Sequence, residues 1–140
     1  FLRDKRWYMW LPAIAGFISV PFMVFIYLVD SPYASLSLAI IPGLLQQVYF
    51  GSTIATTHAL VGLRMRALSS AILFLILNII GLGLGPVVIG YLSDYLQPTF
   101  GVDSLQHAML YVLPFTMFWS ACHFSFASKN LREDLAAAPD

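Results

Sequence analysis

Four long stretches of the chain contain no charged residue, and polar, charged clusters separate them. The uncharged stretches run over residues 7–29, 31–63, 67–93 and 104–128. Each is longer than the roughly 20 residues that a helix needs to cross a bilayer. The pattern therefore predicts an all-α membrane protein with four transmembrane helices. We expect them over about residues 7–29, 33–60, 67–91 and 106–127, followed by a polar tail over residues 128–140.

The charges divide between two sides if the four helices alternate in direction. The start of the chain, the loop after the second helix and the tail then share one side, and all seven basic residues lie there: Arg3, Lys5, Arg6, Arg64, Arg66, Lys129 and Arg132. Asp30, Asp94 and Asp103 lie on the other side. Because basic residues stay in the cytoplasm, this bias predicts a cytoplasmic C-terminus. We expect an integral protein of a bacterial inner membrane or another plasma membrane.

The second stretch carries a polar stripe. At about 100° per residue, one sector of the helix holds the polar side chains, which are Gln46, Tyr49, Thr53, Thr56 and Thr57. The opposite sector is apolar. Because lipid does not solvate such groups, this face either lines an aqueous path or forms hydrogen bonds with neighbouring helices.

Small residues mark one side of the third stretch. Gly81 and Gly85 have the spacing that lets two membrane helices approach closely, and Asn78 lies one turn earlier on the same side. We expect Asn78 to form a hydrogen bond across this helix contact, and Pro86 to bend the helix. Arg64 and Arg66 precede the stretch, where we expect them to anchor the membrane interface or contribute to a cytoplasmic gate.

Composition excludes several other classes of protein. Seven basic and seven acidic residues give no net charge, so we expect no nucleic-acid partner. The lone Cys122 has no partner for a disulfide or a Cys-based metal site, and we expect neither a metal nor another cofactor. The chain has no serine hydrolase or zinc hydrolase motif, so we expect no enzyme.

Two motifs carry a family resemblance. The segment from Gly81 to Gly90 reads G-x-x-x-G-P-x-x-x-G, which resembles a helical motif of major facilitator transporters, with Ile89 departing from that motif. The arginines of segment 63–67, the glycine-proline run of 78–86 and the Ser-Asp pair of 90–94 together resemble the eleventh helix of spinster-like members of that superfamily. The resemblance extends over nearly the whole chain. It implies that the four helices are helices nine to twelve of a twelve-helix transporter.

This resemblance implies a function and roles for individual residues. The whole protein would move a small organic or lipid-like solute by alternating access, with the bilayer and its remaining N-terminal helices as partners. The second helix here would be helix ten, which lines the path, and the implied path residues are Gln46, Tyr49, Thr53 and Thr56. The residues that would bend and pack the next helix are Asn78, Gly81, Gly85, Pro86 and Gly90.

A second hypothesis stays open beside transport. The chain could be a complete four-helix scaffold or assembly subunit, whose polar stripe mediates contacts between copies. The start at Phe1, inside a charged cluster and without a methionine, favours a fragment of a longer protein.

Overall fold

The computed structural model describes residues 4–139, nearly all of them helical. The first two helices are α1 (Trp7–Leu28) and α2 (Pro32–Leu60). A short 3₁₀ turn, η1 (Leu63–Met65), leads into a long rod formed by α3 (Arg66–Ile76), η2 (Leu77–Leu84) and α4 (Gly85–Phe100). A second 3₁₀ turn, η3 (Gly101–Asp103), precedes α5 (Ser104–Ala137). The prediction of an all-α fold is confirmed, while Arg3 lies outside the described residues.

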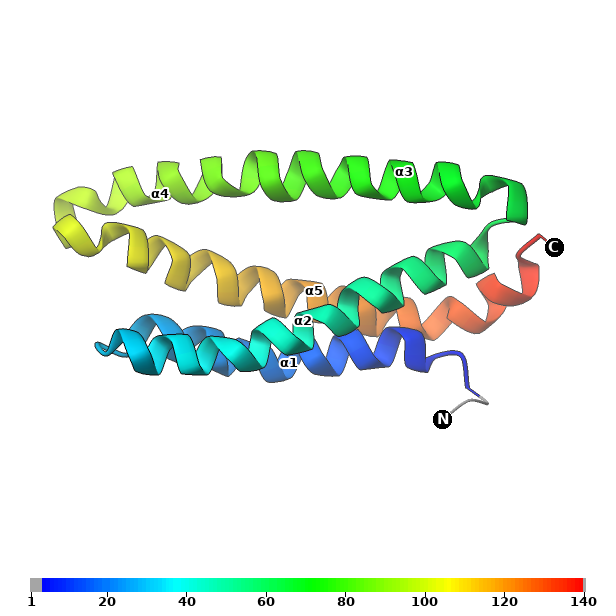
Figure 1. The fold of residues 1–140 in the computed structure, drawn as a ribbon, viewed down its shortest axis with the longest axis horizontal. Helices are drawn as coiled ribbons and strands as arrows, with labels where there is room; N and C mark the ends of the chain where they lie inside the picture. The colour runs from blue at the N-terminus through cyan, green and yellow to red at the C-terminus, as the bar shows by residue number, and fades with distance from the viewer. Residues whose placement is uncertain (1–3, 140) are drawn as a thin grey trace.

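Within residues 4–139, three continuous helical segments are long and apolar enough to cross a membrane: Trp7–Leu28, Pro32–Leu60 and Leu63–Ala137. The last has 75 residues, which as a straight helix would extend over about 110 Å, against a hydrocarbon core of about 30 Å. Figure 1 shows that this segment folds back on itself at η3, so that α4 packs against α5. Gly101 makes the reversal possible, because its φ of 56° lies in the left-handed region that favours glycine. The reversal divides this segment into two arms, each of which could cross the membrane, so four membrane crossings stay the prediction.

Two helices extend beyond their predicted ends. The rod continues to Phe100, although the sequence predicts an end near residue 91. The last helix continues to Ala137, so that most of the predicted tail is helical. Charged residues end an apolar stretch but do not end a helix, and Ser128 and Leu131 are buried in the extension. The position of this extension in the cytoplasm stays a prediction.

The first helix is the centre of the packing. It lies against both α2 and α5, and it supplies much of what is buried in the described structure: Met9, Pro12, Ala13, Ala15, Gly16 and Ser19. The contact with α5 is closest at Gly16, where a Cβ atom would lie 2.9 Å from the Cβ of Ala121. Small side chains therefore let these two helices approach closely.

The rod formed by α3, η2 and α4 has no buried residue in the described structure. It contacts α2 beside η1 and α5 along α4, and Figure 1 shows it as a gently arched element along one edge of the molecule. Its middle segment, η2, is a π-helix, and the backbone N–H of Gly85 donates to the carbonyl of Ile80, five residues earlier. Pro86 follows directly. In place of a sharp bend at Pro86, the structure shows a change of hydrogen-bond register before it.

Both ends of the described chain lie at the same end of the molecule as η1, and the two other turns lie at the opposite end (Figure 1). An ion pair joins the two ends of the chain, with Arg132 Nη2 lying 2.5 Å from Asp4 Oδ2. Arg132 Nε donates a second hydrogen bond, of 3.1 Å, to Asp4 Oδ1. The hydrogen bond from Arg132 holds the pKa of Asp4 below its usual value. The helices thus alternate in direction, as the charge pattern requires, and the side of the membrane that each end faces stays a prediction.

Candidate functional site

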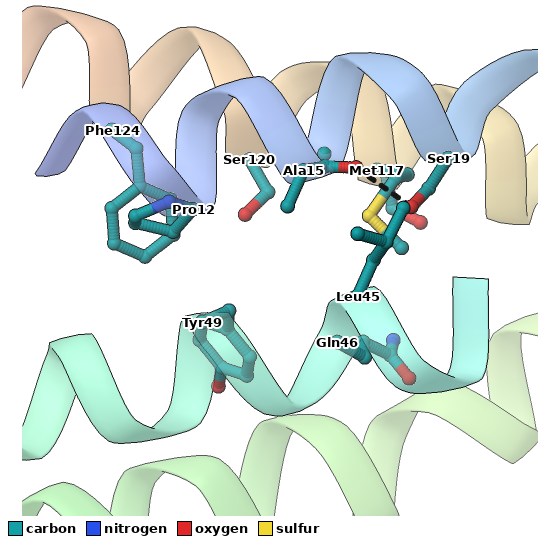
Figure 2. Close-up of a pocket in the computed structure, with 11 residues that line it drawn as sticks. Pro12, Ala15, Ser19, Leu45, Gln46, Tyr49, Met117, Ser120 and Phe124 are labelled. Atoms are coloured by element: carbon teal, nitrogen blue, oxygen red, sulfur yellow. Dashed lines mark hydrogen bonds between the residues drawn. The ribbon is translucent and has the colours of Figure 1, made fainter. Parts of the chain in front are cut away.

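A cavity of about 240 Å³ lies between α1, α2 and α5, and we call it the three-helix cavity. Figure 2 shows α1 and α5 on one side of it and α2 on the other. Its lining combines polar and apolar side chains. The polar ones are Ser19, Gln46, Tyr49, Thr116 and Ser120, and the apolar ones include Pro12, Leu45, Met117 and Phe124.

Several of these polar groups are held in place by their own helix. The hydroxyl of Ser19 donates to the carbonyl of Ala15 over 2.7 Å, and that of Thr116 donates to Leu113 over 3.0 Å. Their oxygens can therefore only accept a further hydrogen bond. The ring of Tyr49 packs edge-to-face on Phe124, with 5.9 Å between centroids, and this contact joins α2 to α5.

The structure separates the four residues predicted for the substrate path. Gln46 and Tyr49 line the three-helix cavity. The hydroxyl of Thr53 donates to the carbonyl of Tyr49 over 2.8 Å. Thr56 is buried and lines a different cavity, of about 190 Å³, together with Lys5 and Tyr8. Its Oγ1 has no hydrogen-bond partner among the described residues.

The polar stripe of α2 therefore faces helices of the same chain. Gln46 and Tyr49 meet α1 and α5, and Thr56 meets the start of α1 and the end of α5. This orientation is compatible with both roles that the sequence leaves open, a path and a contact between helices.

The residues predicted to bend and pack the third helix lie on the exposed rod. The amide of Asn78 donates to the carbonyl of Phe74 in its own helix, over 2.7 Å. A Cβ atom at Gly81 or Gly90 would meet nothing within 4 Å, and at Gly85 only the carbonyl oxygen of Ile80, at 3.9 Å, in the same rod. Within residues 4–139, no helix outside the rod comes within 4 Å of a Cβ atom at these three glycines, and their role in packing stays a prediction.

The two arginines predicted as a gate or anchor lie at the turn between α2 and α3. Arg64 is exposed in η1, and Arg66 Nε donates to the carbonyl of His58 over 3.2 Å. Beside this bond, His58 Nε2 lies 2.6 Å from Ser70 Oγ. Arg66 therefore satisfies a free carbonyl at the end of α2 and fixes the turn.

The three-helix cavity offers hydroxyl, amide and aromatic groups, with no carboxylate or amine in its described lining. Among residues 4–139, no group of three or more His, Cys, Asp or Glu residues could hold a metal ion. The cavity can therefore form hydrogen bonds and apolar contacts with a small molecule.

Ser19 is a residue of the three-helix cavity that the sequence alone does not indicate. It is a single serine in an apolar helix, and its neighbours in the cavity come from α2 and α5, which lie far away along the chain. Without the packing of α1, no pattern distinguishes it from other small residues.

Comparison with known proteins gives one informative similarity. No protein-family model matches the chain, and no solved structure matches it. The chain is 28% identical over 133 residues to an MFS-type efflux pump of Mycolicibacterium smegmatis. The match covers 95% of this chain and 31% of the pump, so the chain spans about a third of its relative's length.

This similarity supports the major facilitator superfamily, a class of membrane transporters. Together with the long apolar helices, it supports an integral membrane protein, and the relative itself is named as a transporter. The similarity gives no support for the spinster-like branch of that superfamily.

Proposed function

We propose that this chain is the C-terminal part, helices nine to twelve, of a twelve-helix secondary transporter. The transporter belongs to the spinster-like branch of the major facilitator superfamily and moves a small organic or lipid-like solute by alternating access. The observation that carries the proposal is a similarity along 95% of this chain to about a third of an efflux pump. The alternating directions of α1, α2, the rod and α5 (Figure 1) fit one third of a twelve-helix fold.

Gln46 and Tyr49 are the proposed contacts with the solute, because both line the three-helix cavity. Gln46 is exposed on α2, and its amide can both donate and accept hydrogen bonds. The ring of Tyr49 supplies an apolar surface beside a hydroxyl group. These neutral groups suit an amphipathic solute whose polar part needs hydrogen bonds. In this proposal Thr53 and Thr56 continue the path toward the end that carries Arg64 and Arg66, which contribute to the cytoplasmic gate.

Transport by the whole native protein tests the proposal. Membrane vesicles or proteoliposomes containing it are loaded with labelled amphipathic solutes, and the rates of release and uptake are compared with those of protein-free vesicles. Gln46→Ala removes one hydrogen-bonding group and should weaken apparent affinity about 2- to 10-fold. Gln47→Ala is the matched control, because Gln47 is exposed beside Gln46 and does not line the three-helix cavity.

Two results would count against this account. Equal transport by both glutamine variants and by the unchanged protein would assign the α2 stripe to contacts between helices. A 140-residue protein that moves no solute and forms one discrete oligomer would favour the scaffold hypothesis. That hypothesis draws its support from the rod, whose apolar side chains are exposed in the described structure.

A further inference from the structure

A second cavity, of about 360 Å³, lies between α1 and α5 near the two ends of the chain, and we call it the α1–α5 cavity. Two cationic side chains line it, those of Arg6 and Lys129. Apolar side chains from α1 form another part of the lining: Trp10, Ile14 and Phe17, each between 41% and 45% exposed. The cavity is therefore open to the surroundings of the molecule and combines charge with an apolar wall.

Neither cationic side chain forms an ion pair within residues 4–139. The Asp4 carboxylate does accept a hydrogen bond of 3.1 Å from the backbone N–H of Arg6, and the charge of Arg6 acts on that carboxylate from nearby. Arg6 Nε is buried and lacks a hydrogen-bond partner among residues 4–139. Lys129 Nζ lies 5.1 Å from the centroid of the Phe126 ring and forms no ion pair there. The Asp4 carboxylate forms an ion pair with Arg132, and this pairing lowers the pKa of Asp4. Because a buried donor without an acceptor is unfavourable, Arg6 indicates an anionic ligand.

The spacing of the lining residues matches one leaflet of a bilayer. Arg6 and Phe17 are eleven residues apart, which corresponds to about 16 Å along a helix. Half of a hydrocarbon core measures about 15 Å. The cations therefore lie at the level of lipid headgroups when the apolar wall lies at the level of acyl chains. The other described basic residues lie in η1, at the start of α3 and near the two ends of the chain, and Figure 1 shows these segments at one end of the molecule. Anionic leaflets attract such an end.

We propose that the α1–α5 cavity binds an anionic phospholipid. Arg6 and Lys129 hold the phosphate, and an acyl chain lies along Trp10, Ile14 and Phe17. The hydroxyls of Ser125 and Ser128 donate to carbonyls of their own helix, so their oxygens accept hydrogen bonds from headgroup hydroxyls. This site depends only on α1 and α5 being embedded in a membrane, and it is independent of which solute the protein transports.

Lipid retention tests the site on the whole native protein. The protein is reconstituted into nanodiscs of equal parts phosphatidylglycerol and phosphatidylcholine and then extracted into mild detergent, and the lipids that stay bound are counted by mass spectrometry. We expect phosphatidylglycerol to be enriched. Each neutralised cation should weaken its binding about five-fold, so Arg6→Gln with Lys129→Gln should weaken it about 25-fold. Lys129→Gln alone changes an exposed side chain and keeps the test informative if Arg6→Gln impairs folding.

The matched control is Arg64→Gln with Arg66→Gln, which removes the same charge at the same end of the molecule, away from this cavity. This control should retain phosphatidylglycerol as the unchanged protein does. Equal retention of both lipids by the unchanged protein, or equal losses in the two double variants, would overturn the proposal. Displacement of the bound lipid by free glycerol phosphate would also overturn it, because a lipid site requires the apolar wall. Any of these results alongside normal solute transport would leave the transport proposal standing.

Discussion

At the scale of single residues, the contact between α1 and α5 depends on a missing side chain. Gly16 faces Ala121 so closely that an added Cβ atom would lie 2.9 Å from the Cβ of Ala121. Such a distance forces a shift of one of the two helices. Gly16 also lines the three-helix cavity, where Met117 of α5 is another lining residue. The size of residue 16 therefore affects both the packing and the cavity.

Gly16→Ala should destabilise the protein by about 1–3 kcal/mol, the usual range for overpacking a well-packed contact. The measurement is the midpoint of thermal unfolding in detergent, followed by circular dichroism. Gly43→Ala is the matched control, because a Cβ atom there meets nothing within 4 Å and alanine favours the helix. A Gly16→Ala protein as stable as the Gly43→Ala protein would contradict the close contact.

The sequence reveals part of the candidate site at this scale. The wheel of α2 groups Gln46 and Tyr49, which the structure places together in the three-helix cavity. It also groups Thr56 with them, although Thr56 lies in another cavity nearer the chain ends. A helical wheel gives the angle of a residue and not its depth along the bundle, so it cannot separate these positions.

At the scale of elements, the rod shows how a membrane helix accommodates proline. Pro86 has no N–H to donate, and its ring opposes the carbonyl four residues earlier. The π-helix over Leu77–Leu84 changes the hydrogen-bond register just before it, and its glycines remain open to approach by another helix. The sequence predicts a perturbation at this place, but several local geometries satisfy a proline, and only the structure selects the π-helix.

Gly85→Leu should impair transport by the whole protein at least several-fold while leaving the stability of α1, α2 and α5 unchanged. No described residue outside the rod lies within 4 Å of a Cβ atom at Gly85, so a new side chain meets nothing else in this chain. It would instead obstruct a helix from the remainder of the transporter. Solute flux and thermal unfolding of the whole protein are measured together. Leu82→Phe, at a side chain that is 75% exposed, is the control for added bulk on the same rod.

Unchanged flux in Gly85→Leu would contradict a packing role for the glycine face. Equal losses in Gly85→Leu and Leu82→Phe would assign the effect to bulk on the rod in general.

At the same scale, two helices end later than hydropathy predicts. Hydropathy locates the edges of apolar stretches, whereas α4 continues to Phe100 and α5 to Ala137 through polar and charged residues. Polar residues can remain helical outside the bilayer, and in α5 the burial of Leu131 stabilises that extension. The sequence therefore predicts the edges of apolar stretches and not the ends of the helices, and the membrane boundaries stay a prediction.

At the scale of the whole molecule, the charge pattern predicts the alternating direction of the helices. The basic residues in the described part of the chain belong to η1, to the start of α3 and to the segments beside the two chain ends, which Figure 1 shows at one end of the molecule. The charge pattern does not predict how the rod packs, because α3, η2 and α4 have no buried residue in the described structure. In the proposed transporter, the remaining helices of the protein would cover the rod. The similar efflux pump is about three times as long as this chain, which supports that proposal.

The central claim is that this chain is the C-terminal part of a transporter about three times its length. An antibody raised against residues 129–140, used on membranes of the source cell, measures the mass of the native product directly. We predict one integral membrane band at about three times the 15.6 kDa of this chain. A single band at 15.6 kDa would contradict the claim and identify a small four-helix protein.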